Sequence, residues 1–239
     1  VRLRAANLKG ANLSLVNLDF SDLEGANLNS AELKGTHLQD ANLCRARLKK
    51  VILDQSYLVD VNLQHAHMEG ASLRYAEMNS AILRSARLNK ANLRGAHLES
   101  SYMEGADLRQ ANLEGASLDY AELKGAKLGQ ALLKDANLEG ANMEGVEITR
   151  TNMKDANLES ANLTRAKGLH WDSLCQIKTC SVCFVKGDDS LHLPLGVAII
   201  PLLDASGLTW EEWKAKHGTL ATGDPFQVVD IVPDEATKS

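Results

Sequence analysis

The chain has 239 residues and a formal net charge of -5, and its hydrophobic fraction is 44% although aromatic residues make up only 4%. This length allows one or two domains, and the scarcity of aromatic residues predicts a narrow core filled by leucine and alanine. The negative net charge argues against a nucleic-acid partner held by bulk positive charge. The longest apolar run, Leu191–Leu203, is interrupted by two prolines and is too short to cross a bilayer, so we expect no membrane partner.

The N-terminal part of the chain carries one uninterrupted five-residue repeat. Every fifth position from Leu3 to Leu163 is Leu, Met or Ile, and the residue two places earlier is always Ala, Val, Ser or Thr. Neither a helix nor a strand can place residues at this spacing on one face. Because Val1 already lies inside the pattern and is not a methionine, we expect that upstream residues were removed, are missing, or belong to a longer parent protein.

The remaining positions of the repeat favour a change of chain direction at each step. Asn or Asp often lies between the two apolar positions, and Gly often lies two residues after the leucine, as in "ANLEG". Asn bends the backbone through local side-chain hydrogen bonds, and Gly does so through its access to positive φ. A chain that turns in the same way at each step forms coils, which stack by backbone pairing into a solenoid.

With these features, residues 1–166 resemble the pentapeptide-repeat family, whose consensus is A-[N/D]-L-x-x. The resemblance implies an all-β solenoid, a right-handed quadrilateral β-helix with four repeats per coil and the Leu-type and small residues pointing inward. The 33 repeats would then make about eight coils and a rod about 38 Å long. No insertion interrupts the register, unlike in many members of the family.

The outward residues of every fourth repeat form one face of such a rod, and the four faces differ in charge. The second face, centred on Leu8, Leu28 and their equivalents, carries nine basic and three acidic residues. The fourth face, centred on Leu18, Leu38 and their equivalents, carries eight acidic residues and no basic one. Its predicted partner-binding residues are Asp19, Phe20, Asp40, Tyr57, Asp60, Glu77, Glu99, Asp119, Tyr120, Glu139 and Glu159. The alternative is a solvated side that binds nothing.

After Ala166 the repeat stops, and residues 167–239 predict a small mixed α/β cap with short helices and strands and a loose tail from about residue 233. "TWEEWKAKHG" has the capping-box pattern of a short helix. Cys175, Cys180 and Cys183 are weak candidates for zinc ligands, with His170 or His192 as a fourth ligand; redox-active, disulfide-bonded and free thiols are the alternatives. Four cysteines in this arrangement are no disulfide framework, so we expect a reducing, cytoplasmic location.

The sequence predicts a protein that is not an enzyme and uses no cofactor, because its histidines are dispersed and no nucleophile, carboxylate pair or phosphate loop has catalytic spacing. We expect a protein–protein interaction scaffold that presents the acidic face to an unidentified protein, with no direct contact to nucleic acid. Dimers formed end to end or through the C-terminal segment are compatible with it. One alternative, taken from the resemblance, is a DNA mimic that binds a type II topoisomerase such as gyrase; another is a structural domain of a longer multidomain chain.

Overall fold

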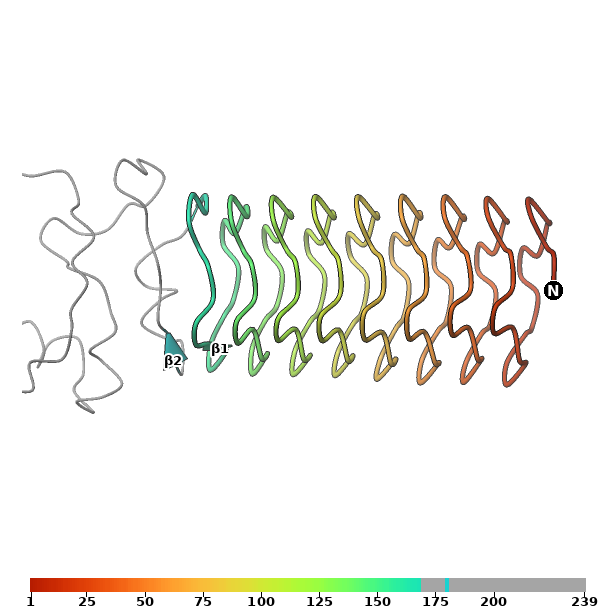
Figure 1. Ribbon diagram of the computed structural model, residues 1–239, viewed down its shortest axis with the longest axis horizontal. Coiled ribbons are helices and arrows are strands. Elements are labelled where there is room, and N and C mark those ends of the chain that lie inside the picture. Colours follow the sequence, from red (N-terminus) through yellow and green to blue (C-terminus); the bar gives the residue numbers. More distant parts are fainter. Residues whose placement is uncertain (169–178, 181–239) are drawn as a thin grey trace, which may run out of the picture.

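The computed structural model describes residues 1–168 and 179–180, and in residues 1–168 the chain winds into a four-sided rod (Figure 1). Residues twenty positions apart pair as parallel β-bridges, from Arg2 with Asp22 to Glu147 with Lys167. This register confirms the predicted four repeats per coil. One longer pairing joins β1 (Asn157–Leu158) to β2 (Thr179–Cys180) in parallel, with Asn157 opposite Thr179. Among the described residues there is no helix long and apolar enough to span a membrane.

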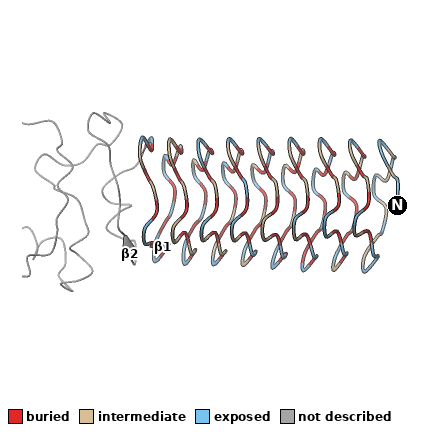
Figure 2. Ribbon diagram, in the orientation of Figure 1, coloured by how far each residue is buried: buried red, intermediate tan, exposed pale blue. Residues whose placement is uncertain are grey.

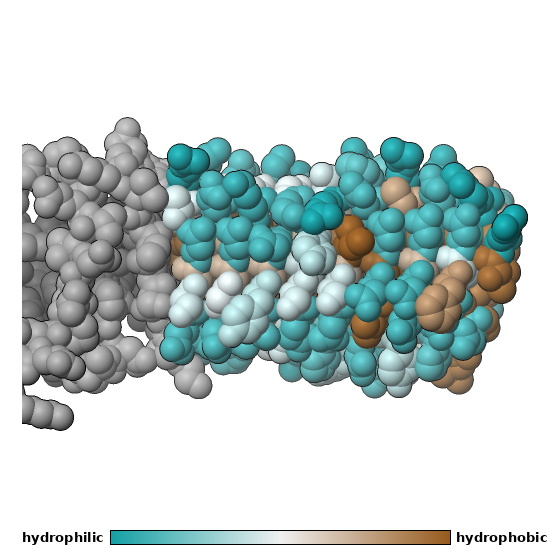
Figure 3. Space-filling view, viewed as in Figure 1, coloured by the Kyte–Doolittle hydropathy of each residue, from teal (hydrophilic) through white to brown (hydrophobic). Residues whose placement is uncertain are grey.

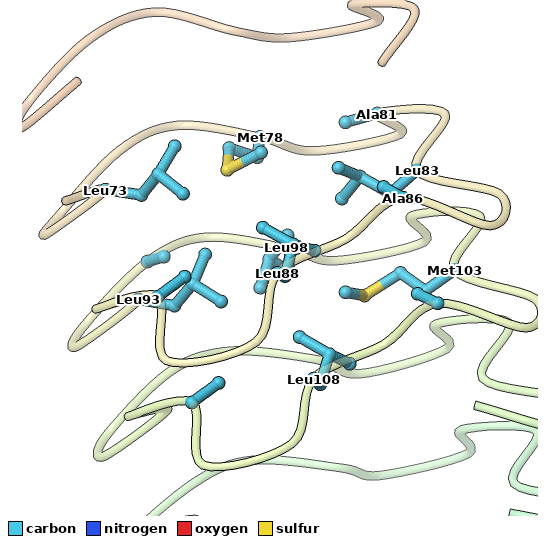
Figure 4. Packing of buried hydrophobic residues seen from close by; sticks show 14 of the residues in the cluster. Leu73, Met78, Ala81, Leu83, Ala86, Leu88, Leu93, Leu98, Met103 and Leu108 are labelled. Atoms are coloured by element: carbon cyan, nitrogen blue, oxygen red, sulfur yellow. The ribbon is translucent and has the colours of Figure 1, made fainter. Parts of the chain in front are cut away.

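The core runs along the rod axis and contains the two predicted inward positions of every repeat. From the second coil onward, every Leu-type residue and every small residue two places before it is buried (Figure 2). Side chains at equivalent positions of successive coils stack, so that Leu73 lies next to Leu93 and Met78 next to Leu98 (Figure 4). In the first coil, Leu3, Leu8 and Leu13 are only partly buried, because only one neighbouring coil packs against them.

The chain turns at the two residues that follow each Leu-type residue. The turn is closed by a backbone hydrogen bond such as that from Ala111 N–H to the Leu108 carbonyl, at 3.0 Å. At all 33 turns the second residue has a positive φ, although only ten of these residues are glycine. The other 23 adopt it at a cost of about 1 kcal/mol each. Glycine therefore supplies the turn conformation at some positions, as predicted, while at most of them the coil imposes it on other residues.

The asparagines between the inward positions stabilise the coil in two ways. Their side-chain oxygens accept the backbone N–H two residues later, as Asn112 Oδ1 does from Glu114 at 2.9 Å. This is the predicted local hydrogen bond. Asparagines of successive coils also bind one another, and Asn157 Nδ2 donates to Asn137 Oδ1 at 2.9 Å.

The predicted C-terminal cap lies almost wholly outside the described residues. Only the backbone of Thr179 and Cys180 is described, and it adds one strand beside the last coil. The predicted helices, the remaining strand residues, the loose tail and the boundary of a second domain stay predictions.

Candidate functional site

Each coil consists of four flat sides and four edges, and the outward residues of a repeat are divided between them. The residue between the two buried positions lies at the centre of a flat side, and the two residues after the Leu-type residue form the edge where the chain turns. We number sides and edges in chain order. The fourth edge thus contains residues 19–20, 39–40 and so on to 159–160, and we call it the acidic edge. A predicted face is one flat side together with the edge that follows it.

The structure divides the predicted partner-binding residues unequally between these two parts of the fourth face. Tyr57 and Glu77 lie on the flat side, where Glu77 pairs with the backbone of both neighbouring coils. The other nine lie on the acidic edge, where the seven carboxylates are accompanied by no lysine or arginine; they are Asp19, Phe20, Asp40, Asp60, Glu99, Asp119, Tyr120, Glu139 and Glu159. The charge predicted for a broad face is therefore concentrated on a narrow edge.

Four of these carboxylates form a continuous row in the C-terminal half of the rod. Glu99, Asp119, Glu139 and Glu159 occupy the first turn position of four successive coils. Backbone hydrogen bonds fix their stacking, because the N–H of Tyr120 donates to the Glu139 carbonyl at 2.8 Å and the turns before and after are joined in the same way. Successive carboxylates are thus about 4.8 Å apart along the rod axis.

Amide and imidazole groups, not lysine or arginine side chains, contact this row. Asn137 Nδ2 donates to Asp119 Oδ1 at 3.1 Å, and Asn157 Nδ2 lies 3.5 Å from Glu139 Oε2. Glu99 accepts from Asn79 Nδ2, and its other oxygen lies 3.2 Å from His97 Nδ1. Among the described residues, no lysine or arginine forms an ion pair with a carboxylate of the acidic edge. The row therefore has no lysine or arginine to offset it.

Toward the N-terminus the acidic residues are not in one row. Gln39, Val59 and Asn79 occupy the first turn position between Asp19 and Glu99, while Asp40 and Asp60 lie at the second. Asp19 Oδ1 accepts the Gln39 backbone N–H at 2.8 Å.

Exposed aromatic side chains accompany the carboxylates. Phe20 and Tyr120 lie on the acidic edge and are 73% and 60% exposed. On the flat side next to it, Tyr57 stacks on His37 with ring centroids 4.5 Å apart. The view in Figure 3 is mainly hydrophilic, with more hydrophobic side chains toward the N-terminal end of the rod. Large exposed side chains among charged ones are typical of protein contacts.

The sequence-based faces missed residues that border the acidic edge from the next flat side. Glu122 follows the edge by two residues and adds negative charge there, whereas Asp22, at the equivalent position, has Arg4 Nε 4.0 Å from its Oδ2. Tyr102 lies on the same flat side, and the Arg84 guanidinium lies 4.7 Å from its ring centroid. Grouping by repeat assigned them to the first face. The asparagine positions could have corrected this, because they mark the centres of the flat sides.

The other edges and sides neutralise most of their carboxylates. On the first edge, Arg84 Nε lies 3.0 Å from Glu104 Oε1 and Lys124 Nζ lies 2.7 Å from Glu144 Oε2. The Lys124 hydrogen bond lowers the pKa of Glu144. On the second side, the hydrogen bonds from Arg109 lower the pKa of Asp107. The acidic edge therefore differs from the rest of the rod in its lack of basic partners as well as in its charge.

Asp54 on the third edge is the most buried carboxylate among the described residues. Arg74 Nε donates to its Oδ2 at 2.9 Å, and Ser72 Oγ donates to its Oδ1 at 2.6 Å. Burial alone would raise the pKa of Asp54, but the hydrogen bonds from Arg74 and Ser72 outweigh it and hold the pKa below its usual value. This pair joins two successive coils.

The predicted metal ligands cannot be compared with the structure. Cys175, Cys183 and both candidate histidines lie outside the described residues, as does the side chain of Cys180. Within residues 1–168, no group of histidine, cysteine and carboxylate side chains could hold a metal ion, and Cys44 is a free thiol.

These observations define the class of the protein as a β-solenoid with one unneutralised acidic edge. The chain belongs to the pentapeptide repeat family, whose profile matches eight copies within residues 1–35, 26–64, 52–89, 62–99, 91–130 and 126–165. Members of this family form right-handed quadrilateral β-helices, the fold predicted from the sequence.

Several solved structures are similar to the chain, whereas no curated protein matches it in sequence. HetL, a pentapeptide repeat protein involved in heterocyst differentiation regulation in the cyanobacterium Nostoc sp., is 28% identical; the match covers 66% of this chain and 82% of HetL with a TM-score of 0.39. A pentapeptide repeat protein from the Arabidopsis thaliana thylakoid lumen is 27% identical, with coverages of 46% and 79% and a TM-score of 0.37. QnrB1, a plasmid-mediated fluoroquinolone resistance protein, is 20% identical, with coverages of 87% and 95% and a TM-score of 0.39.

Proposed function

We propose that the protein is a non-catalytic scaffold that binds another protein along its acidic edge. The observation that carries this proposal is the row from Glu99 to Glu159, which has no lysine or arginine partner although the other sides and edges of the same rod pair most of their carboxylates. Uncompensated like charges about 5 Å apart repel by about 0.8 kcal/mol per pair in water. No lysine or arginine offsets this repulsion, so a binding role supplies a reason for the row.

The chemistry of the edge indicates the kind of partner. Carboxylates in a straight row favour a surface with regularly spaced lysine or arginine side chains, which steers encounter and fixes orientation. Tyr120, at the second turn position beside Asp119, offers a large and mostly exposed ring within the row. Such a ring adds apolar contact area at the centre of an otherwise polar interface.

A DNA mimic that binds a type II topoisomerase has less support. Its carboxylates would replace a row of phosphates, but they occupy one edge only, and the opposite part of the rod carries nine basic residues against three acidic ones. A DNA supercoiling assay with gyrase separates the two functions: no effect of the protein at micromolar concentration would exclude the mimic and leave the scaffold.

The proposal is tested by charge reversal followed by capture of binding partners. The full chain and the variant E99K/D119K/E139K are immobilised, exposed to lysate of the source cells, and the captured proteins are identified by mass spectrometry. We expect partners that the parent chain retains and that the variant loses, because the central part of the row becomes positive.

The control variant is E114K/D135K/D155K, which makes the same change in net charge at turn positions of the third edge. It should retain the partners. Equal capture by the parent chain and the E99K/D119K/E139K variant would overturn the proposal, and equal loss in both variants would indicate dependence on net charge instead of the acidic edge.

A further inference from the structure

We infer that the partner of the acidic edge is a second copy of this chain, which docks with its basic surface and aligns its rod in parallel. We define the basic surface as the second flat side together with the second edge. This inference rests on the proposed function, because it names an occupant for the same edge.

The basic surface is a charged surface in its own right. Within the 33 repeats its basic residues are Lys9, Arg47, Lys49, Lys50, Arg87, Lys90, Arg109, Lys127 and Arg150, against Glu69, Asp107 and Glu147. Lys49 and Arg87 share Glu69, and Arg109 pairs with Asp107. Among the described residues the other six basic side chains form no ion pair within 4.0 Å, although the charge of Lys127 contributes to the lowered pKa of Asp107, so this surface carries more positive than negative charge.

The two surfaces lie on opposite parts of the rod and match in position along it. Since a coil has four edges, the second and the fourth are diagonal to each other. Five coils of twenty residues contain both an unpaired base of the basic surface and an acid of the acidic edge. The pairs are Lys9 with Asp19, Lys50 with Asp60, Lys90 with Glu99, Lys127 with Glu139, and Arg150 with Glu159.

A second copy displaced sideways therefore brings opposite charges together with a shift along the axis of about half a coil, or about 2.4 Å. The backbone of both surfaces repeats at the same interval, because the same coil carries both. Unpaired bases of the basic surface occur in the first, third, fifth, seventh and eighth coils, and each of these coils also carries an acid of the acidic edge. This charge complementarity along the rod favours a second copy as the occupant of the acidic edge.

The geometry also sets the form of the assembly. The acidic edge of one copy uses the basic surface of the next and leaves its own basic surface free. Such a heterologous contact does not close on itself when the copies are related by a sideways displacement. The expected assembly is an open row of parallel rods that lengthens with concentration, not a closed dimer.

The test uses sedimentation velocity of the full chain at several concentrations in about 0.01 M and about 1 M salt, over which the screening length falls from about 30 Å to about 3 Å. We expect species larger than a dimer at low salt, and a loss of association by at least about tenfold at high salt. A chain that stays monomeric at every concentration at low salt, or an assembly that is insensitive to salt, would overturn the inference.

Two charge-reversal variants make the test specific. D60K/E99K/E139K/E159K makes the acidic edge positive, and K50E/K90E/K127E/R150E makes the basic surface negative in the same four coils. Each variant alone should be monomeric, and an equimolar mixture should associate again because opposite charges then meet. Association of either variant alone, or no association of the mixture, would contradict the docking described here; circular dichroism checks that both variants fold.

The same variants separate this inference from the proposed function. K50E/K90E/K127E/R150E keeps the acidic edge and should still capture a separate protein partner if one exists. If the parent chain is monomeric but captures such a partner through the acidic edge, this inference fails and the proposed function stands. If copies associate as expected and no separate partner is captured, the protein is a scaffold for its own assembly.

Discussion

The ring of Tyr120 covers Gly140 of the next coil so closely that a Cβ atom on Gly140 would lie 2.6 Å from a ring carbon. Gly140 also has a φ of +62°. Two independent requirements therefore fall on one residue: a backbone conformation that suits glycine, and room for the tyrosine ring.

We expect Gly140→Ala to destabilise the rod by more than the conformational cost of about 1 kcal/mol, because the ring must also move. Gly115→Ala is the matched control, since Gly115 has the same φ of +62° but nothing within 4 Å of the added Cβ. Urea unfolding of both variants gives the comparison. Adding Tyr120→Ala to Gly140→Ala should recover the difference between them, and equal destabilisation by the two glycine substitutions would show that the ring contact has no effect.

Ser101 lies in the core at a position usually held by alanine, and its buried hydroxyl has no hydrogen-bond partner. Ser101→Ala should raise the free energy of unfolding by about 1 kcal/mol, because an unsatisfied polar group is removed from an apolar environment. Ser56 has the same place in its repeat, but its Oγ donates to the Leu53 carbonyl at 2.6 Å. Ser56→Ala should therefore not stabilise the protein. Chemical denaturation of both variants measures the contrast, and a gain from Ser56→Ala equal to that from Ser101→Ala would refute this account of the core.

The ion pair between Asp54 and Arg74 should make stability depend on pH in the acidic range. The pKa of Asp54 is lower in the folded state than in the unfolded chain, because the folded state favours the ionised carboxylate. This contribution is fully present above the unfolded pKa of about 4 and is lost as pH falls through the lower folded value.

Asp54→Asn should consequently lower the free energy of unfolding by about 1–3 kcal/mol at neutral pH, and the deficit relative to the parent chain should shrink below about pH 4. Arg74→Gln removes the same pair from the other side and should follow the same trend. Unfolding titrations between about pH 2 and 7 provide the measurement. A deficit that stays constant over this range would mean that the pair contributes no pH dependence.

Glu139 lies between Asp119 and Glu159 in the acidic row, so Glu139→Gln should relieve repulsion. We expect a gain of about 0.5 kcal/mol in the free energy of unfolding at low ionic strength, and a smaller gain in high salt. Glu104 occupies the same turn position on the first edge but pairs with Arg84. Glu104→Gln should therefore give no gain. A loss of stability in Glu139→Gln at low salt would show that the row is favourable to the fold, which would remove the main argument for its binding role.

The sequence predicted the solenoid well because the two inward positions are repeated without exception. Leu73 and Leu93 are buried, as their spacing indicates. The twenty-residue register came from the resemblance, since spacing alone does not say how many repeats close a coil. The steric pairing of Tyr120 with Gly140 could also have been predicted, because Tyr75 and Gly95 show the same combination twenty residues apart.

Other properties depend on contacts between coils that the pattern of one repeat does not contain. Asp54 occupies an outward turn position, and it is buried only because Arg74 and Ser72 of the next coil bind over it. The division of each face into a flat side and an edge likewise depends on backbone turns. The sequence gives the number of charges, but only the structure shows that Glu77 lies on the flat side and that Glu122 borders the acidic edge.

The uniform turn has a consequence for how this protein can change by duplication or loss of short segments. Every turn has the same backbone conformation whatever residue occupies it. Duplication of a single five-residue unit would therefore leave the inward residues inward, but it would rotate all later outward residues by a quarter of a coil. Glu159 would then move to the first edge. One small genetic event could thus redistribute the charges of half the rod over different edges without a single substitution in the core.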